Sequence, residues 1–356
     1  MRDMLKKMNK NTKSNLITYG IVIAAFIIMQ TLISTGSISS LMEGLMVPLC
    51  IYIILAVSLN LVVGILGELS LGHAGFMCVG AFTSAFFSKC MRDVITIAPL
   101  RFILALLIGM AVAAVFGIII GIPVLRLKGD YLAIVTLAFG EIIKNLVNVL
   151  FIGKDSNGFH FSTKDVMDLN MEADGTVLVN GPQGITGTPK DSTFLIGVIL
   201  ILITLFIVIN MINSRDGRAI MAIRDNRIAA ESVGINVTKY KLMAFTVSAA
   251  LAGAAGVLYA HNLSTLTANT NNFGYNMSIN ILVFVVLGGI GSIRGSMIAA
   301  VILTLLPELL RGLSDYRMLI YAIVLILMML FNWSPKAIEW REKYLSFGKK
   351  KKEAVK

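Results

Sequence analysis

The sequence has little charge and little material for metal or disulfide chemistry. Only 14% of its 356 residues are charged, against about 25% in a typical soluble domain. Its three cysteines, Cys50, Cys78 and Cys90, show no pairing pattern, so we expect no disulfide framework. Its three histidines are scattered over separate segments, whereas a metal site needs several ligands that converge. The sequence therefore predicts no bound metal.

Motifs of nucleotide and hydrolytic chemistry are missing too. The chain has no GxxxxGKS/T loop to cradle phosphates, no HExxH pair of metal ligands and no GxSxG nucleophile turn. We therefore expect that the chain is not itself an enzyme and that it carries no cofactor.

Apolar runs long enough to cross a membrane are abundant, since 56% of the residues are hydrophobic. A spanning helix needs about 20 mostly apolar residues. The sequence predicts an all-α polytopic membrane protein with about ten transmembrane helices. They are expected near residues 16–35, 41–66, 68–88, 99–125, 130–151, 193–213, 240–261, 277–291, 294–313 and 316–333. Glycines and an arginine in LGGIGSIRGS interrupt the eighth and ninth, so eight or nine is the alternative count.

Basic residues gather in three segments and thereby predict the orientation. Residues 1–15 hold five of them, residues 214–241 hold six and residues 334–356 hold eight, whereas residues 152–192 hold three beside six acidic residues. Cytoplasmic loops carry the excess of Lys and Arg. This placement accounts for the net charge of +11 without a nucleic-acid partner.

We therefore expect a plasma (inner) membrane protein with both termini in the cytoplasm. Its parts are a basic N-terminus (1–15), a transmembrane domain (16–333) with a solvated, mobile outer loop (152–192) and a cytoplasmic loop (214–239), and a basic tail (334–356).

The cytoplasmic stretch GRAIMAIRDNRIAAESVGIN, 217–236, predicts a short amphipathic helix. Four of its residues fall near one another at helical spacing: Ile220, Ile223, Ala230 and Val233. Arg227 and Glu231 are four apart and can pair, and Gly234 is well placed to end the helix. Lipid-surface helices usually carry a bulky apolar face and a basic polar face. The mixed charge here favours a protein partner; a solvated loop or a surface helix is the alternative.

The segment AIRDNRIAAESVGINVTKYKLMAFTVSAALAGAAGVLYA, 222–260, resembles a stretch of the permease subunits of ATP-binding-cassette importers. The resemblance is to the branched-chain amino-acid (LIV-type) group, and it is closest to the second, M-type permease. Four more segments resemble the group in order: residues 59–82, 129–146, 180–187 and 281–300. Members often carry GGSDG outside, where this chain has NGPQG.

The resemblance implies partners and contact residues. In that group the cytoplasmic loop docks into a groove on a separate ATPase subunit. The residues assigned to this coupling contact are Arg224, Asp225, Ala229, Ala230, Glu231 and Gly234. The expected partners are a second permease, two ATP-binding subunits, an extracytoplasmic solute-binding protein, the lipid bilayer and an amino-acid substrate. Gly181, Gly184 and Thr186 are the candidates for docking of the binding protein.

Two glycine-rich clusters interrupt the spans and are candidates for the translocation pathway. Unpaired backbone groups are costly in lipid, and interrupted segments often lie near a transport route. The candidates are Glu68, Ser70, His73, Gly75, Gly288, Gly289, Gly291 and Ser292. Close helix packing through small residues is the alternative, with His73 a hydrogen-bonded buried histidine.

Two weaker signals lie in the same spans. Ser58 to Asn60 and Gly75 to Met77 recur as Ser278 to Asn280 and Gly295 to Met297, at an offset of 220 residues, which hints at a duplication. Glu141 and Lys144 lie one turn apart and are expected to form a structural ion pair.

The predicted function is therefore transport of branched-chain or related amino acids as one subunit of an ATP-driven importer. Urea or short amides are alternative substrates within that interpretation. A secondary transporter or channel for a small polar solute, which uses no ATP, is the alternative class of transport protein. That alternative gives the mixed-charge helix no role.

Overall fold

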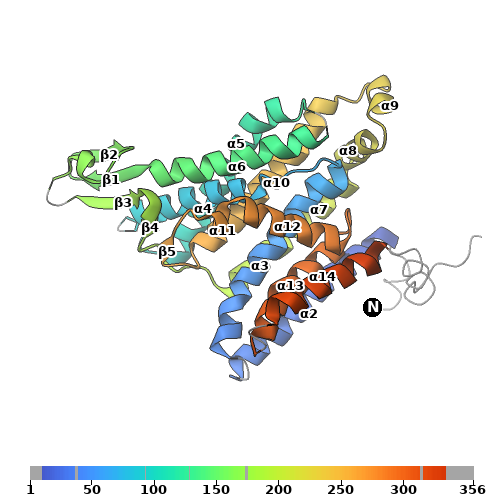
Figure 1. The fold of residues 1–356 in the computed structure, drawn as a ribbon, viewed down its shortest axis with the longest axis horizontal. Helices are drawn as coiled ribbons and strands as arrows, with labels where there is room; N and C mark the ends of the chain where they lie inside the picture. Colours follow the sequence, from blue (N-terminus) through green and yellow to red (C-terminus); the bar gives the residue numbers. More distant parts are fainter. Residues whose placement is uncertain are drawn as a thin grey trace, which may run out of the picture.

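The computed structural model describes residues 10–36, 39–92, 94–127, 129–172, 175–312 and 316–333. Figure 1 shows a bundle of helices with a small β-sheet at one end and α8 and α9 at the other. We call these the sheet end and the coupling end. The basic tail and residues 1–9 lie outside the described residues.

The all-α polytopic fold is confirmed, because ten long helices of the described residues correspond to the ten expected spans. They are α2 (Lys10–Ser34), α3 (Ser40–Asn60), α4 (His73–Cys90), α5 (Ala98–Val124), α6 (Asp130–Val149), α7 (Phe194–Asn213), α10 (Val237–Ala260), α12 (Tyr275–Gly288), α13 (Ile293–Leu309) and α14 (Arg317–Trp333). Six helices in the described part are long and apolar enough to cross a membrane: α2, α3 with its extension, α5, α6, α7 and α10.

The centre of the bundle is built on α3, α4, α5 and α10. In the apolar stretch of the α3 span 89% of the residues are buried, whereas in that of α2 only 6% are buried. α3 is therefore central and α2 peripheral. Where α4 and α10 cross, a Cβ added to Gly80 would lie 2.4 Å from the carbonyl oxygen of Gly253. Small residues at such crossings let helix backbones approach closely, which is how membrane helices gain packing energy.

Both predicted interruptions are real breaks in the helices. The span after α3 continues as a π-helical turn, η1 (Leu61–Leu66), and ends at Gly67 with φ of +79°. Because that left-handed backbone stops the winding, α4 begins at His73 and not near residue 68. The second break, between α12 and α13, places Gly289 at φ +94° and Gly291 at φ +82°.

The segment expected to be a mobile outer loop is folded. A three-stranded antiparallel sheet has the order β2-β1-β3, formed by β1 (Phe151–Asp155), β2 (Gly158–Ser162) and β3 (Thr176–Asn180). A second pair joins β4 (Ile185–Thr186) to β5 (Thr265–Leu266). The short helices η2 (Met167–Leu169), η3 (Gly181–Gln183) and α11 (Thr270–Phe273) complete this end.

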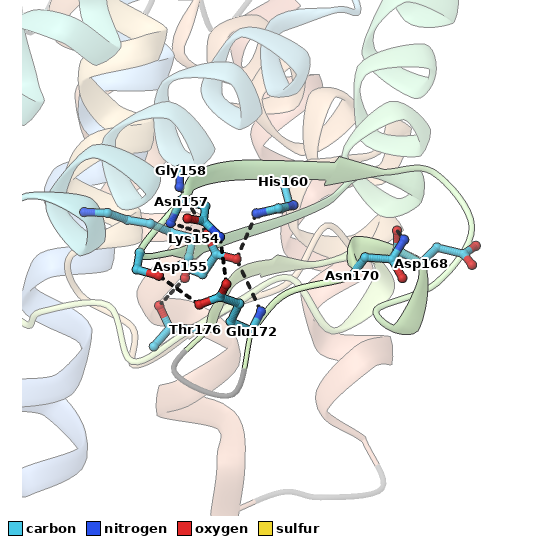
Figure 2. A network of polar contacts seen from close by, with 10 residues as sticks. Lys154, Asp155, Asn157, Gly158, His160, Asp168, Asn170, Glu172 and Thr176 are labelled. Carbon is cyan, nitrogen blue, oxygen red and sulfur yellow. Dashed lines mark hydrogen bonds and ion pairs between the residues drawn. The ribbon is translucent and has the colours of Figure 1, made fainter.

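One carboxylate organises the β1–β2 hairpin, as Figure 2 shows. Asp155 accepts hydrogen bonds from the backbone N–H groups of Asn157 at 2.9 Å and Gly158 at 3.1 Å, and it lies 2.9 Å from Nε2 of His160. The backbone N–H of Glu172 donates to its second oxygen at 3.3 Å. Desolvation opposes the charged form, but these donors together hold the pKa of Asp155 below its usual value.

Two contacts fasten the sheet end to the helices. Lys89, at the end of α4, donates to the carbonyl oxygen of Val177 in β3 at 2.7 Å. Arg101, at the start of α5, pairs with Asp191 at 2.8 Å, and both side chains are largely buried. The sheet is therefore anchored to α4 through β3, and the segment between β4 and α7 is anchored to α5.

Candidate functional site

The mixed-charge segment forms two helices where one was predicted. α8 (Arg215–Asp225) begins at Ser214, whose side chain accepts from the N–H of Gly217 at 3.1 Å. α9 (Arg227–Ser232) begins at Asn226, whose extended backbone and side-chain bond to Ala229 break the helix and start a new one. Gly234, at φ +85°, lies two residues beyond α9, as expected of a glycine that ends a helix.

Each of the two helices has some side chains buried against the rest of the protein and others exposed at its surface. Ile220 and Ile223 of α8 are buried against the bundle, and Ala230 of α9 is buried with them. Val233, expected on that apolar face, is instead 75% exposed, beside Ile228 at 80%. The predicted pair of Arg227 with Glu231 is confirmed at 3.0 Å.

α9 and the residue that follows it therefore expose two aliphatic side chains, Ile228 and Val233, in the same short segment as an exposed ion pair. Apolar side chains flanked by charge, at the end of a membrane bundle, suit a protein partner.

Arg224 points the other way and joins α8 to the first helix break. One of its guanidinium nitrogens donates to the carbonyl oxygen of Gly64 in η1 at 2.9 Å. Its aliphatic stem covers Gly67, because a Cβ there would lie 2.5 Å from Cγ of Arg224. Its Nε and the other terminal nitrogen bond Asp225 at 3.1 and 3.0 Å. The π turn thus presents a backbone carbonyl to a cation on α8.

An ion pair also holds the first helix break, from α10. Lys241, in the first turns of α10, pairs with Glu68, and the two side chains are 7% and 16% exposed. α8 precedes α9 and α10 follows it. Gly67 is therefore contacted from α8 by Arg224, and Glu68 is bound from α10 by Lys241.

The two breaks lie against each other. A Cβ on Gly64 would lie 2.4 Å from the backbone nitrogen of Gly291, so the chains touch where neither has a side chain. The amide of Asn60 bridges them: it accepts from the N–H of Gly291 at 2.9 Å and donates to Ser296 Oγ at 2.9 Å. The two breaks are therefore held together by a backbone contact and by the Asn60 side chain.

The two interrupted helix pairs contact each other in a reciprocal way, although the residues in contact do not correspond to one another at the offset of 220. Asn60, near the end of α3, contacts Ser296 at the start of α13. In return, Ser278 in α12 accepts from the backbone N–H of Ala74, at the start of α4, at 3.2 Å. The two interrupted pairs are α3 with α4 and α12 with α13. The first helix of each pair thus contacts the beginning of the second helix of the other pair, an arrangement that fits a duplication.

The first pathway cluster is covered by this chain's own helices. His73 is 2% exposed, and its Nε2 lies 2.7 Å from Ser58 Oγ. Ser70 is also buried. Gly75 packs on Gly140 of α6, where an added Cβ would lie 2.7 Å from the Gly140 Cα. Glu68 is bound to Lys241 as described.

The second cluster forms the turn between α12 and α13. Gly288 packs on Gly295, and Ser292 caps α13 by accepting from the N–H of Gly295 at 3.2 Å. Gly289 and Gly291 supply the left-handed backbone of the turn. Gly291 contacts Gly64 in the π turn that precedes the first cluster, and a lining role for the residues of both clusters stays a prediction.

The predicted ion pair within a span is confirmed. Lys144 Nζ lies 2.5 Å from a carboxylate oxygen of Glu141 and 3.2 Å from Thr270 Oγ1. The other Glu141 oxygen accepts from the backbone N–H of Tyr275, the first residue of α12, at 2.8 Å. The pair therefore fixes α11 and α12 to α6.

The three external docking candidates differ in accessibility. Gly181 and Gly184 are buried in the turn between β3 and β4, whereas Thr186 is exposed on β4. Gly184 packs so tightly that an added Cβ would meet the carbonyl oxygen of Leu266 at 1.9 Å. The two glycines shape the turn, and Thr186 is accessible to a partner.

Three residues that were not among the predicted site residues hold this site together: Asn60, which the sequence marked only for the repeat, Gly64 and Lys241. A lysine inside an apolar helix needs a partner, so Lys241 carried a usable signal. The contact of Arg224 with Gly64 joins residues 160 positions apart, and nothing local marks it.

A bundle of apolar helices with two glycine-rich breaks, one of them bound to a charged helix pair at the end of the bundle, is typical of a membrane transport protein. The chain belongs to a particular family of this class. Residues 41–331 match the family described as branched-chain amino acid transport system / permease component.

Individual relatives agree with that assignment. The chain is 37% identical over 298 residues to the high-affinity branched-chain amino acid transport system permease protein LivM of Salmonella typhimurium, covering 81% of this chain and 67% of the relative. LivM of Escherichia coli gives the same identity and coverage. The ribose import permease protein RbsC of Escherichia coli is 28% identical over 78% of this chain and 81% of the relative. No solved structure matches the chain.

Proposed function

We propose that this chain is the M-type permease of an ATP-driven importer, and that it translocates leucine, isoleucine, valine or related amino acids. The observation that carries the proposal is the contact of Arg224 with the carbonyl oxygen of Gly64. It links a segment with an exposed, partner-like surface to a break inside the membrane bundle. Membership in the branched-chain amino acid permease family supports the substrate class.

In this proposal α9 docks on an ATPase subunit in the cytoplasm through Ile228, Val233 and the Arg227–Glu231 pair. Closure of the ATPase pair displaces α9 and with it α8 and the start of α10. Arg224 and Lys241 then pull on Gly64 and Glu68, and the contact of Gly64 with Gly291 carries the displacement to the second break. Nucleotide thus biases the bundle between two packings, as alternating access requires.

The coupling end then faces the cytoplasm, together with both termini, in the plasma (inner) membrane. The sheet end faces outward, where a solute-binding protein delivers the amino acid beside Thr186. The remaining partners are a second permease and two ATP-binding subunits. The basic residues of the α8–α10 segment support this orientation.

The docking role is tested in membranes that hold the whole importer, with the variants Ile228→Asp and Glu231→Lys. We expect the ATPase subunits to copurify poorly and leucine uptake to fall by about tenfold or more, because charge placed in a buried interface is costly. Met167→Asp, at an exposed site on the sheet end, is the control. Normal copurification and uptake in both α9 variants would contradict docking.

The energy source and the substrate are tested separately. Uptake is measured with ATP hydrolysis blocked while the membrane gradient is maintained, and we expect it to stop. Continued uptake would identify a secondary transporter or channel. A panel of leucine, isoleucine, valine, urea and acetamide, each supplied with the binding protein, shows which solute stimulates ATP hydrolysis; we expect the branched-chain amino acids.

A further inference from the structure

Polar side chains are exposed on α6 and α12 at a depth where the surroundings should be lipid. Asn145 of α6 and Asn280 of α12 are exposed, Asn276 is half-buried, and Tyr275 is 44% exposed. We call these four residues the amide strip. Asn276 bonds only another asparagine, Asn271, among the hydrogen bonds of the described residues.

The depth of the amide strip follows from Glu141. The membrane-spanning part of α6 runs from Tyr131 to Val149, so Glu141 lies one residue beyond its midpoint. The first N–H of α12 bonds Glu141, which places Tyr275 near the middle of the span. α12 then runs toward the coupling end, because the turn that follows it meets Gly64, and Gly64 is bonded by Arg224 of α8. Figure 1 shows α8 at that end. At about 1.5 Å per residue, Asn280 lies about 8 Å further along, still inside a layer about 30 Å thick.

The exposed face of α5 is the contrast within the same bundle. From Phe102 onward every exposed residue of α5 is apolar: Ile103, Leu107, Ala111, Val115, Ile118, Ile119, Ile122 and Pro123. That surface suits lipid. An asparagine side chain exposed to hydrocarbon would lose its hydrogen bonds, at a cost of several kcal/mol (about 4–8 for transfer to cyclohexane). The amide strip therefore faces water or polar groups in the assembled protein.

We propose that the amide strip is this subunit's wall of the translocation route and that it contacts the charged ends of a zwitterionic amino acid. The proposal rests on the function proposed above. Each amide offers two donors and an acceptor, so one kind of side chain serves both a carboxylate and an ammonium group. Glu141 adds no net charge because Lys144 neutralises it. The wall is thus polar and electrically neutral, as a solute with no net charge requires.

Single cysteines in the assembled importer test the proposal, in a Cys90→Ser background because Cys50 and Cys78 are buried. Asn145→Cys, Asn276→Cys and Asn280→Cys are compared with Leu107→Cys on α5, and copurification with the ATPase subunits confirms assembly. The probe is a sulfonate-bearing methanethiosulfonate. The thiolate that reacts forms only in water, so we expect the strip cysteines to react about tenfold faster or more than Leu107→Cys.

If the amide strip lines a translocation route, bound substrate and transport turnover should also change the rate at which the thiol reagent labels the strip cysteines. Leucine with its binding protein and nucleotide should slow labelling of Asn276→Cys or Asn280→Cys and leave Leu107→Cys unchanged. Asn280→Leu should lower leucine uptake with the complex intact, whereas Ile279→Leu beside it should not.

Strip cysteines no more reactive than Leu107→Cys in an assembled importer would overturn the proposal. So would labelling that leucine and nucleotide do not change. Neither result touches the ATP dependence of uptake or the docking of α9, so failure here is distinguishable from failure of the proposed function.

Discussion

At the scale of single residues, the coupling end depends on side chains that reach from one element into another. The Arg227–Glu231 pair and Gly234 were predictable, because they act within four residues of each other or of a helix end. The contact of Arg224 with Gly64 was not, because it depends on how α8 folds back on the bundle. Arg224 was singled out for the partner surface, but its guanidinium faces its own chain.

The Arg224→Ala variant separates transmission from docking. A hydrogen bond to a charged group is worth about 1.5–3 kcal/mol, so we expect leucine uptake to fall by about tenfold or more. The ATPase subunits should still copurify, because the outer face of α9 is unchanged. Uptake and ATP hydrolysis are measured together, and hydrolysis without uptake is the expected pattern.

Arg218→Ala is the matched control, since Arg218 lies on the same helix and bonds only the carbonyl oxygen of Asn213, at the end of α7, among the contacts of the described residues. Loss of the ATPase subunits from Arg224→Ala would show that this residue docks and does not transmit.

At the scale of elements, helix positions were predictable and their interruptions only partly. Glycines marked both breaks, but the start of α4 at His73 depends on the π turn that precedes Gly67. The division of α8 from α9 depends on the cap formed by Asn226. The sheet was missed because its three strands are only five residues long and lie in a segment rich in Gly, Asp and Asn, and because its key residue, Asp155, gathers donors from up to 17 residues away.

The β1–β2 hairpin should depend on acid in a predictable direction. The pKa of Asp155 is depressed in the folded hairpin, so its contribution is fully present above its unfolded value of about 3.9. The contribution is lost as the pH falls through the lower, folded-state pKa. The hydrogen-exchange protection factors of residues 151–162, which correct for the slower intrinsic exchange in acid, should therefore fall as the pH is lowered.

Asp155→Asn should quicken the same exchange already at neutral pH and remove its acid dependence through this group. Asp168→Asn, at an exposed position on the same segment, is the control. Unchanged exchange in Asp155→Asn would show that the strand pairing holds the hairpin without the carboxylate.

At the scale of the whole molecule, the number of long helices followed from apolar runs, since the hydrocarbon layer sets a length that sequence reveals directly. Which helices are central did not follow, because α2 and α3 are similarly apolar yet one is peripheral and the other buried. The repeat at an offset of 220 residues was a faint signal; the reciprocal contacts of Asn60 and Ser278 give it structural content.

The orientation is testable on intact cells and on inverted vesicles. With Cys90→Ser as background, Met167→Cys marks the sheet end and Ala229→Cys the coupling end, and both sites are exposed. A membrane-impermeant thiol reagent should label Met167→Cys only in cells and Ala229→Cys only in inverted vesicles that lack the ATPase subunits, because a docked ATPase would cover α9. The reverse pattern would place the coupling end outside and exclude its contact with a cytoplasmic motor.

The π-helical turn at Leu61–Leu66 holds more residues than an α-helical turn of the same kind would need. Rewinding it to α geometry would advance the chain by one position, which rotates the residues after the turn by about 100° and shifts them by about 1.5 Å. Gly67 and Glu68 would swing while α3 stayed in place. The extra residue of the π turn is thus a reserve for a discrete rotation of the segment after it. Arg224 bonds the carbonyl oxygen of Gly64 within this turn, so loss of that bond would release the turn for rewinding.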